Sequence, residues 1–303
     1  MKCTSPRGRG ELISGRALTR RLAALDPVRE NEEATRLGIE VRYGDAIFVH
    51  AAYTVAFARQ VAVPAISRVL YRRGTGDMMH DARRRNDDTL VFFGEMLRHG
   101  HSSVSGRAAI DRMEAIHSRF GISDQDKLYT LGSLAFEADR ILDHLGLTVF
   151  TDAERLARFH FWRSVGEHMG LEVPATRSEL LSWTIDYENT HYAYTEGGRV
   201  IVDQLFEDWR QRWFPGPLRP LADNVLLLIL DDQLRATHRL PDPSAAVRRI
   251  APPIINSYMR FQSARPHRLD RSWVDHFRRD DAGPVDLEQI GYQPGRYGVG
   301  RLD

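Results

Sequence analysis

The sequence is poor in cysteine and in long apolar runs, and each absence excludes a class of protein. Cys3 is the only cysteine, which rules out a disulfide framework, a cysteine zinc cluster and a well-buried thiolate ligand. Residues 1–16 contain no apolar segment of the kind found in secretory signals. The longest apolar runs, such as Val225 to Leu230, are too short to cross a bilayer. We therefore expect a cytoplasmic protein without a transmembrane segment.

The sequence also has no large excess of positive or negative charge. The 42 lysines and arginines nearly cancel the 41 aspartates and glutamates, so the composition gives no general case for nucleic acid or an anionic membrane as partner. Nearly all of the cations are arginine. Arginine binds carboxylates and phosphates through a planar fork, although a GC-rich genome also enriches this residue.

The sequence is rich in residues that start and end helices. Hydrophobic residues make up 42% of 303 residues, enough for a sizeable core, and strand alternation is scarce. Capping residues and glycines predict these helices: 89–97, 105–120, 124–145, 151–169, 177–194, 199–213, 220–237 and 243–262. Pro252-Pro253 predicts a kink or a split in the last one. We expect an all-α protein with one helical domain over 41–264, a weakly patterned N-terminal extension over 1–40 and an irregular tail over 265–303.

The predicted helix 105–120 carries the first candidate for chemistry. Four apolar side chains define its buried stripe: Ala109, Met113, Ile116 and Phe120. His117 lies beside this stripe, so its imidazole should point inward. A neutral inward imidazole can ligate haem iron, although an inward histidine is more often a hydrogen-bonded core residue.

The second candidate is the polar run from Arg83 to Thr89. Asp87 or Asp88 is placed to act as the N-cap of a helix that begins at Thr89. A hydroxyl and a carboxylate at a helix start would also suit the wall of a cofactor pocket, where they would orient a bound oxygen species or move a proton.

Longer stretches carry a family resemblance. The runs RRRNDDTLVFFGEMLRHG, SGRAAIDRMEAIHSRFGISDQDKLYTLGSLAFEADRIL, TDAERLARFHFWRSVGEHMGLEVP and WTIDYENTHYA resemble the rubber oxygenase and MpaB-like oxygenase family, most closely its MpaB-like branch. The resemblance spans about Asp81 to Gln262. It implies an all-helical haem b protein that uses dioxygen to oxidise or cleave a small lipophilic substrate. The rubber oxygenase cleaves carbon–carbon double bonds, and the resemblance to the fungal branch implies a role in secondary metabolism.

The resemblance also assigns residues. The family's proximal histidine falls on His117, and its distal arginine and threonine fall on Arg85 and Thr89. The rubber oxygenase has a lysine where this chain has Asp88, whereas the fungal relatives have an acid there. We expect Arg85, Asp88 and Thr89 to supply distal polarity. The candidates for neutralising the haem propionates are Arg112, Arg119 and Arg140.

Two alternatives stay open. Glu114 with His117 and Glu188 with His191 form two E-x-x-H pairs, and two such pairs with further glutamates make a non-haem di-iron site in helical bundles. The candidate extra carboxylates are Glu95, Glu137 and Glu154. The other alternative is a non-catalytic helical protein that binds haem or lipid. The sequence leaves the oligomeric state open.

Overall fold

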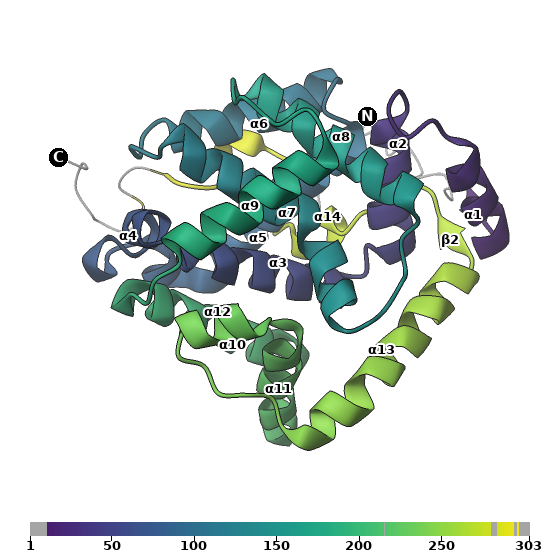
Figure 1. Ribbon diagram of the computed structural model, residues 1–303. Coiled ribbons are helices and arrows are strands. Elements are labelled where there is room, and N and C mark those ends of the chain that lie inside the picture. The colour runs from purple at the N-terminus through teal and green to yellow at the C-terminus, as the bar shows by residue number, and fades with distance from the viewer. Residues whose placement is uncertain (1–10, 215, 280–283, 294–295, 297–303) are drawn as a thin grey trace, which may run out of the picture.

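A computed structural model describes residues 11–214, 216–279, 284–293 and 296, and Cys3 lies outside them. The expectation of an all-α fold is confirmed, because helices form nearly all of the regular structure (Figure 1). In the first half of the chain these are α1 (Gly15–Ala24), α2 (Asn31–Thr35), the π-helix η1 (Arg36–Arg42), α3 (Ala46–Val61), α4 (Pro64–Tyr71), the 3₁₀ turn η2 (Arg72–Gly74), α5 (Asp77–His99), α6 (Val104–His117) and α7 (Asp124–His144).

The second half continues in the same way. Its elements are α8 (Asp152–His168), α9 (Arg177–His191), α10 (Glu196–Trp213), η3 (Gly216–Leu218), α11 (Arg219–Ile229), α12 (Asp232–Thr237), α13 (Ala245–Ala264), α14 (Val274–Phe277) and η4 (Leu287–Gln289). The strands β1 (Leu12–Ile13) and β2 (His267–Arg268) pair in an antiparallel ladder.

The core forms around α3, which is apolar on most of its faces and therefore lies inside the protein. Helices α7 and α10 pack against α3, and α5 packs against α10, α6 and α4. Most helix starts carry the predicted caps. Ser123 caps α7, and Thr151 with Glu154 forms a capping box on α8. Local sequence therefore sets these helix starts.

The structure corrects the predicted start of the helix at Thr89. Helix α5 begins at Asp77 and is kinked at Asp81, whose backbone is not helical. Asp87 and Asp88 lie beyond this kink, buried inside the helix, and neither is an N-cap. Both carboxylates find partners in other elements, Arg212 in α10 and Arg279 near the C-terminus. The two carboxylates are therefore partnered by arginines from distant parts of the chain and not by the backbone N–H groups of a helix start.

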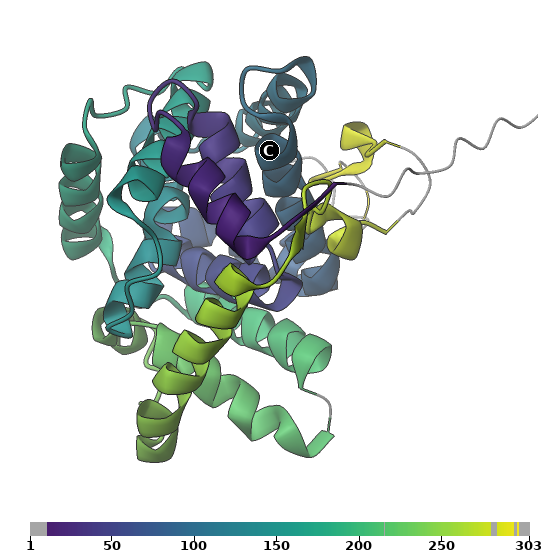
Figure 2. The same cartoon turned by 90° about the vertical axis from the view of Figure 1, so that its right-hand side faces the viewer.

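Two C-terminal predictions also need correction. Helix α13 runs unbroken through Pro252 and Pro253. It lies along the outside of the molecule (Figure 2), where water can hydrate the carbonyl groups that lose an N–H partner. The predicted helix 220–237 is divided into α11 and α12, because Asp231 caps a new helix after the extended residue Leu230.

The terminal segments are more ordered than the sequence pattern indicates. Leu18, Leu22 and Leu37 form a small core cluster with Val41. At the other end, Trp273 packs into the main core and donates a hydrogen bond from its indole nitrogen to the Leu90 carbonyl oxygen (2.8 Å). The described parts of both ends therefore belong to the packed structure, and Figure 2 shows the yellow C-terminal segment beside α5.

Gly94 tests this packing of α14 on α5. A Cβ atom at Gly94 would lie 2.3 Å from Val274 Cγ2 and 2.7 Å from Trp273 Nε1. Gly94→Ala should therefore lower the free energy of unfolding by about 1–3 kcal/mol, although alanine favours an isolated helix by about 1 kcal/mol. Gly121→Ala, where nothing lies within 4 Å, should change it by less than about 1 kcal/mol. Denaturant unfolding measures both, and equal stability of the two variants would contradict this packing.

Candidate active site

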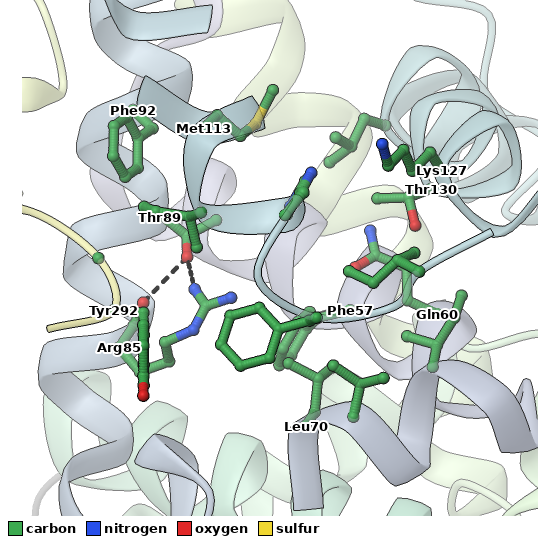
Figure 3. A pocket seen from close by; sticks show the side chains of 18 of the residues that line it. Phe57, Gln60, Leu70, Arg85, Thr89, Phe92, Met113, Lys127, Thr130 and Tyr292 are labelled. Carbon is green, nitrogen blue, oxygen red and sulfur yellow. Dashed lines mark hydrogen bonds between the residues drawn. The ribbon is translucent and has the colours of Figure 1, made fainter. Parts of the chain in front are cut away.

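A large apolar cavity lies between α3, α4, α5, α6, α7 and α8, and residues of the C-terminal segment complete its wall (Figure 3). The unfilled space is about 1360 Å³, part of which is open to solvent. Most of the wall is hydrophobic, including Phe57, Leu70, Phe92, Met113, Ile116 and Trp162. The polar and charged wall residues include Arg72, Arg85, Thr89, His117 and Lys127. An apolar cavity with a few convergent polar groups is typical of a small-molecule site.

His117 is the last residue of α6 and lines this cavity. Its Nδ1 is buried and has no hydrogen-bond partner among the described residues. Burial, together with the positive charges of Arg85 and Lys127, lowers the pKa of His117 to about 4. The imidazole is therefore neutral at pH 7, which is the form that can donate a lone pair to a metal.

Arg85 and Thr89 lie one turn apart on α5 and both face the cavity. The Thr89 hydroxyl donates to the Arg85 carbonyl oxygen (2.9 Å) and accepts a hydrogen bond from the Arg85 guanidinium. The guanidinium carbon lies 5.7 Å from the Phe57 ring centroid. Arg85 forms no ion pair with any described carboxylate, so its charge is uncompensated in an apolar wall.

Two further cations line the cavity that the sequence did not single out. Arg72 pairs with Asp77 (2.6 Å), and Lys127 pairs with Glu114 (2.7 Å). Arg72 also has a left-handed backbone conformation (φ 45°), which is uncommon for a residue other than glycine. Neither residue belongs to a motif in the sequence, so only the fold reveals that both reach the cavity.

Asp88 does not line the cavity. Its carboxylate accepts a hydrogen bond from the Gly291 backbone N–H (3.0 Å) and pairs with Arg279, and burial raises its pKa. The expectation that Asp88 supplies distal polarity therefore does not fit this structure. Side chains at positions 85 and 89 turn toward the cavity, whereas that of Asp88 turns toward the C-terminal segment.

The three arginines expected to meet propionates lie elsewhere. Arg112 donates to the carbonyl oxygens of Leu287 and Glu288 (both 3.2 Å). Arg140 forms a bidentate pair with Glu188 (2.6 and 2.7 Å). Neither lines the cavity, because each is held by a partner in another part of the fold. Arg119 lines a smaller, more open hollow that shares Arg72 with the main cavity.

The two E-x-x-H pairs do not converge. The Glu188 carboxylate is taken by Arg140, and the His191 ring stacks on Tyr187 with centroids 3.9 Å apart. Glu114 is paired with Lys127. No group of three or more histidine, cysteine, aspartate or glutamate side chains that would hold a metal ion occurs among the described residues. The di-iron alternative is therefore not supported.

Sequence comparison identifies the family to which this chain belongs. The family described as ER-bound oxygenase mpaB/B′/Rubber oxygenase, catalytic domain, matches residues 41–264. The chain belongs to this family. The resemblance found in the sequence is thereby confirmed.

Individual relatives are distant. The ER-bound oxygenase mpaB′ of Penicillium brevicompactum is 25% identical over 206 residues, which cover 62% of this chain and 48% of that protein. The ER-bound oxygenase mpaB of Penicillium roqueforti (strain FM164) is also 25% identical over 206 residues, covering 62% of this chain and 68% of that protein. The chain thus spans about half the length of the first relative.

One solved structure of the family shares the fold. Latex clearing protein LCP in the closed state superposes with a TM-score of 0.52 at 20% identity, over 80% of this chain and 67% of that chain. Among the residues that the structure describes, no single helix is long and apolar enough to cross a membrane. Helices α3 and α4 pass that test only as a pair bent by 107°.

The depressed pKa of His117 predicts a pH effect on stability. The folded pKa is about 4 and the ordinary value is 6.5, so between these values the unfolded chain binds a proton that the folded protein excludes. Stability should therefore fall as pH drops from 6.5 to 4, by up to about 1.4 kcal/mol per unit, and stay level above 6.5 as far as His117 is concerned.

His117→Gln removes this titration, so the variant should lose less stability than the wild type across that window. His144→Gln, a change of an exposed histidine, is the control and should follow the wild type. Urea unfolding at a series of pH values measures the three slopes. Parallel curves for His117→Gln and the wild type would refute the buried neutral state of this ring.

Proposed function

We propose that the protein is a haem b-dependent oxygenase in which His117 is the iron ligand. The observation that carries the proposal is the neutral His117 ring on the wall of an apolar cavity, with a buried nitrogen that has no hydrogen-bond partner among the described residues. An unpartnered buried polar atom costs about 1–3 kcal/mol, and a metal or an acceptor would offset this cost. Family membership supports the reaction class.

The residues around the cavity fit a haem. The fit lies in the chemistry of the walls, which are mostly apolar and carry the His117 imidazole as a candidate iron ligand. Arg72 and Lys127 would neutralise the propionates in place of Arg112 and Arg140, because they line the cavity and, unlike Arg85, do not belong to the distal pair. Haem b, when bound, supplies the binding and activation of dioxygen.

Arg85 and Thr89 take different roles in this proposal. The Thr89 proton is committed to the Arg85 carbonyl oxygen, so the hydroxyl is a positioning group that also accepts from the guanidinium. Arg85 has further N–H groups and no acidic partner among the described residues, which makes it the hydrogen-bond donor of the cavity. A preorganised donor in a site with little water stabilises developing negative charge strongly.

The apolar wall supports a small lipophilic substrate, and the resemblance to rubber oxygenase favours an unsaturated one. The Arg85 and Thr89 side chains would orient its reacting end, while the aromatic and methionine side chains exclude water. A role in secondary metabolism and the cytoplasmic location expected from the N-terminus stay predictions.

The first test is the absorption spectrum after reconstitution with haem. The wild type should show a Soret band and a pyridine haemochrome typical of haem b. His117→Ala should lose most of the bound haem while its helical circular dichroism is unchanged, and His191→Ala, from the other E-x-x-H pair, should keep both. Full haem content in His117→Ala would remove this residue from the role.

The second test concerns Arg85. Oxygen uptake is measured for reconstituted protein with an unsaturated isoprenoid as substrate. Arg85→Met removes the donor at nearly constant length, so kcat should fall by about 10²–10³ with KM changing much less. Arg83→Met, a change of an exposed neighbouring arginine, should stay within a factor of about two of the wild type. Absence of oxygen uptake in the wild type, despite bound haem, would favour the non-catalytic alternative.

A further inference from the structure

The C-terminal strap, defined as residues 284–293, closes one side of the cavity although it lies beyond the family-matched residues 41–264. Gly291 and Tyr292 are both part of the cavity wall. In Figure 3 the strap approaches from the side of Arg85 and Thr89, whereas Lys127 and Thr130 lie on the other side. The size of the cavity at this end thus depends on a segment outside the helical core.

Two side chains from the helices hold the strap. Arg112 in α6 donates to three of its carbonyl oxygens, those of Leu287, Glu288 and Ile290. Asp88 in α5 accepts from the Gly291 N–H (3.0 Å). Because Asp88 is buried, loss of this carboxylate would leave a buried backbone N–H without a partner. Asp88 is thus the contact by which α5 fixes the position of Gly291.

Gly291 allows the strap to come this close. Its φ of +77° is a left-handed conformation that glycine adopts without strain. A Cβ atom there would lie 2.6 Å from Ile116 Cδ1 and 3.2 Å from Phe92 Cε2, two other residues of the cavity wall. Any larger residue at this position would have to push the strap outward.

Tyr292 is the next residue after Gly291, so the contacts of Gly291 also fix its position. Its ring packs edge-on against Phe120, with centroids 4.9 Å apart, and the Arg72 guanidinium carbon lies 5.3 Å from its centroid. These contacts are of the aromatic and cation–π type. Both of these contacts are made by the ring.

We propose that Tyr292 is a specificity-determining residue that limits the length of the molecule the cavity accepts, and that Asp88 is the positioning residue that keeps it there. Asp88 lies between Arg85 and Thr89 in the sequence, and in this proposal its role is to fix the shape of the substrate site. The inference deepens the proposed function by stating what restricts its lipophilic substrate. It rests on that function only in taking this cavity as the place where substrate binds.

The test uses the full chain without added haem. Anilinonaphthalene sulfonate is bound to the cavity and displaced by n-alkanols of increasing chain length. Each added methylene that enters the apolar cavity should strengthen binding about fourfold. In the wild type this gain should stop at the length at which the chain meets Tyr292.

Tyr292→Ala, Gly291→Ala and Asp88→Ala, which removes the acceptor for the Gly291 N–H, should each extend the gain to longer alkanols, so that the longest bind at least tenfold more tightly than to the wild type. Tyr292→Phe keeps the ring and should restore the wild-type limit. Gly146→Ala changes a glycine of similar φ (+68°) with nothing within 4 Å, and Asp143→Asn removes an exposed paired carboxylate. Both controls should keep the wild-type limit.

An unchanged limit in Tyr292→Ala and Gly291→Ala would overturn the proposal, and so would a limit shifted equally by the controls. If Asp88→Ala fails to fold, these two variants still decide the role of Tyr292, and hydrogen exchange of the strap in Gly291→Ala reports its release. Because displacement is measured without haem, failure of the haem proposal would leave this result intact.

Discussion

The structure depends on how three consecutive polar residues inside α5 are satisfied. Residues 86–88 are all buried, and a buried polar group without a partner would destabilise the helix. Asn86 bonds to Tyr53 in α3 and to Asp208 in α10, Asp87 pairs with Arg212 in α10, and Asp88 holds Gly291 of the C-terminal strap. One short run thus links α5 to two core helices and to a segment two hundred residues away.

The same run fixes which residues reach the cavity. Once residues 86–88 face their partners, helical geometry turns positions 85 and 89 to a common side, and that side is the cavity wall. His117 arrives from a different helix, at the C-terminal end of α6. Arg85 and His117 line the same cavity, and the positive charge of Arg85 lowers the pKa of His117. Within five residues of α5, positions 86–88 bind other parts of the fold, and positions 85 and 89 line the candidate site.

Sequence reasoning succeeded where the signal was local. Helix starts with a capping side chain were found because the capping oxygen and the backbone N–H that donates to it lie three residues apart, as in the Thr151 box. The inward position of His117 followed from helical spacing. The role of Asp88 and the reach of Arg72 depend on partners far along the chain, such as Gly291, and no local pattern reveals these. The cap assigned to Asp88 was wrong for this reason, since a tertiary contact replaced a local one.

The charges of the cavity explain why a neutral imidazole and a free guanidinium occur together. Arg72 and Lys127 each have an acidic partner, whereas Arg85 has only the Thr89 hydroxyl among the described residues. This excess of positive charge opposes protonation of His117, which keeps its lone pair available. A half-buried guanidinium without a counter-charge is itself costly, and a guest with an oxygen or a negative charge near Arg85 reduces that cost. The cavity therefore favours a molecule that is apolar along most of its length and polar where it meets Arg85.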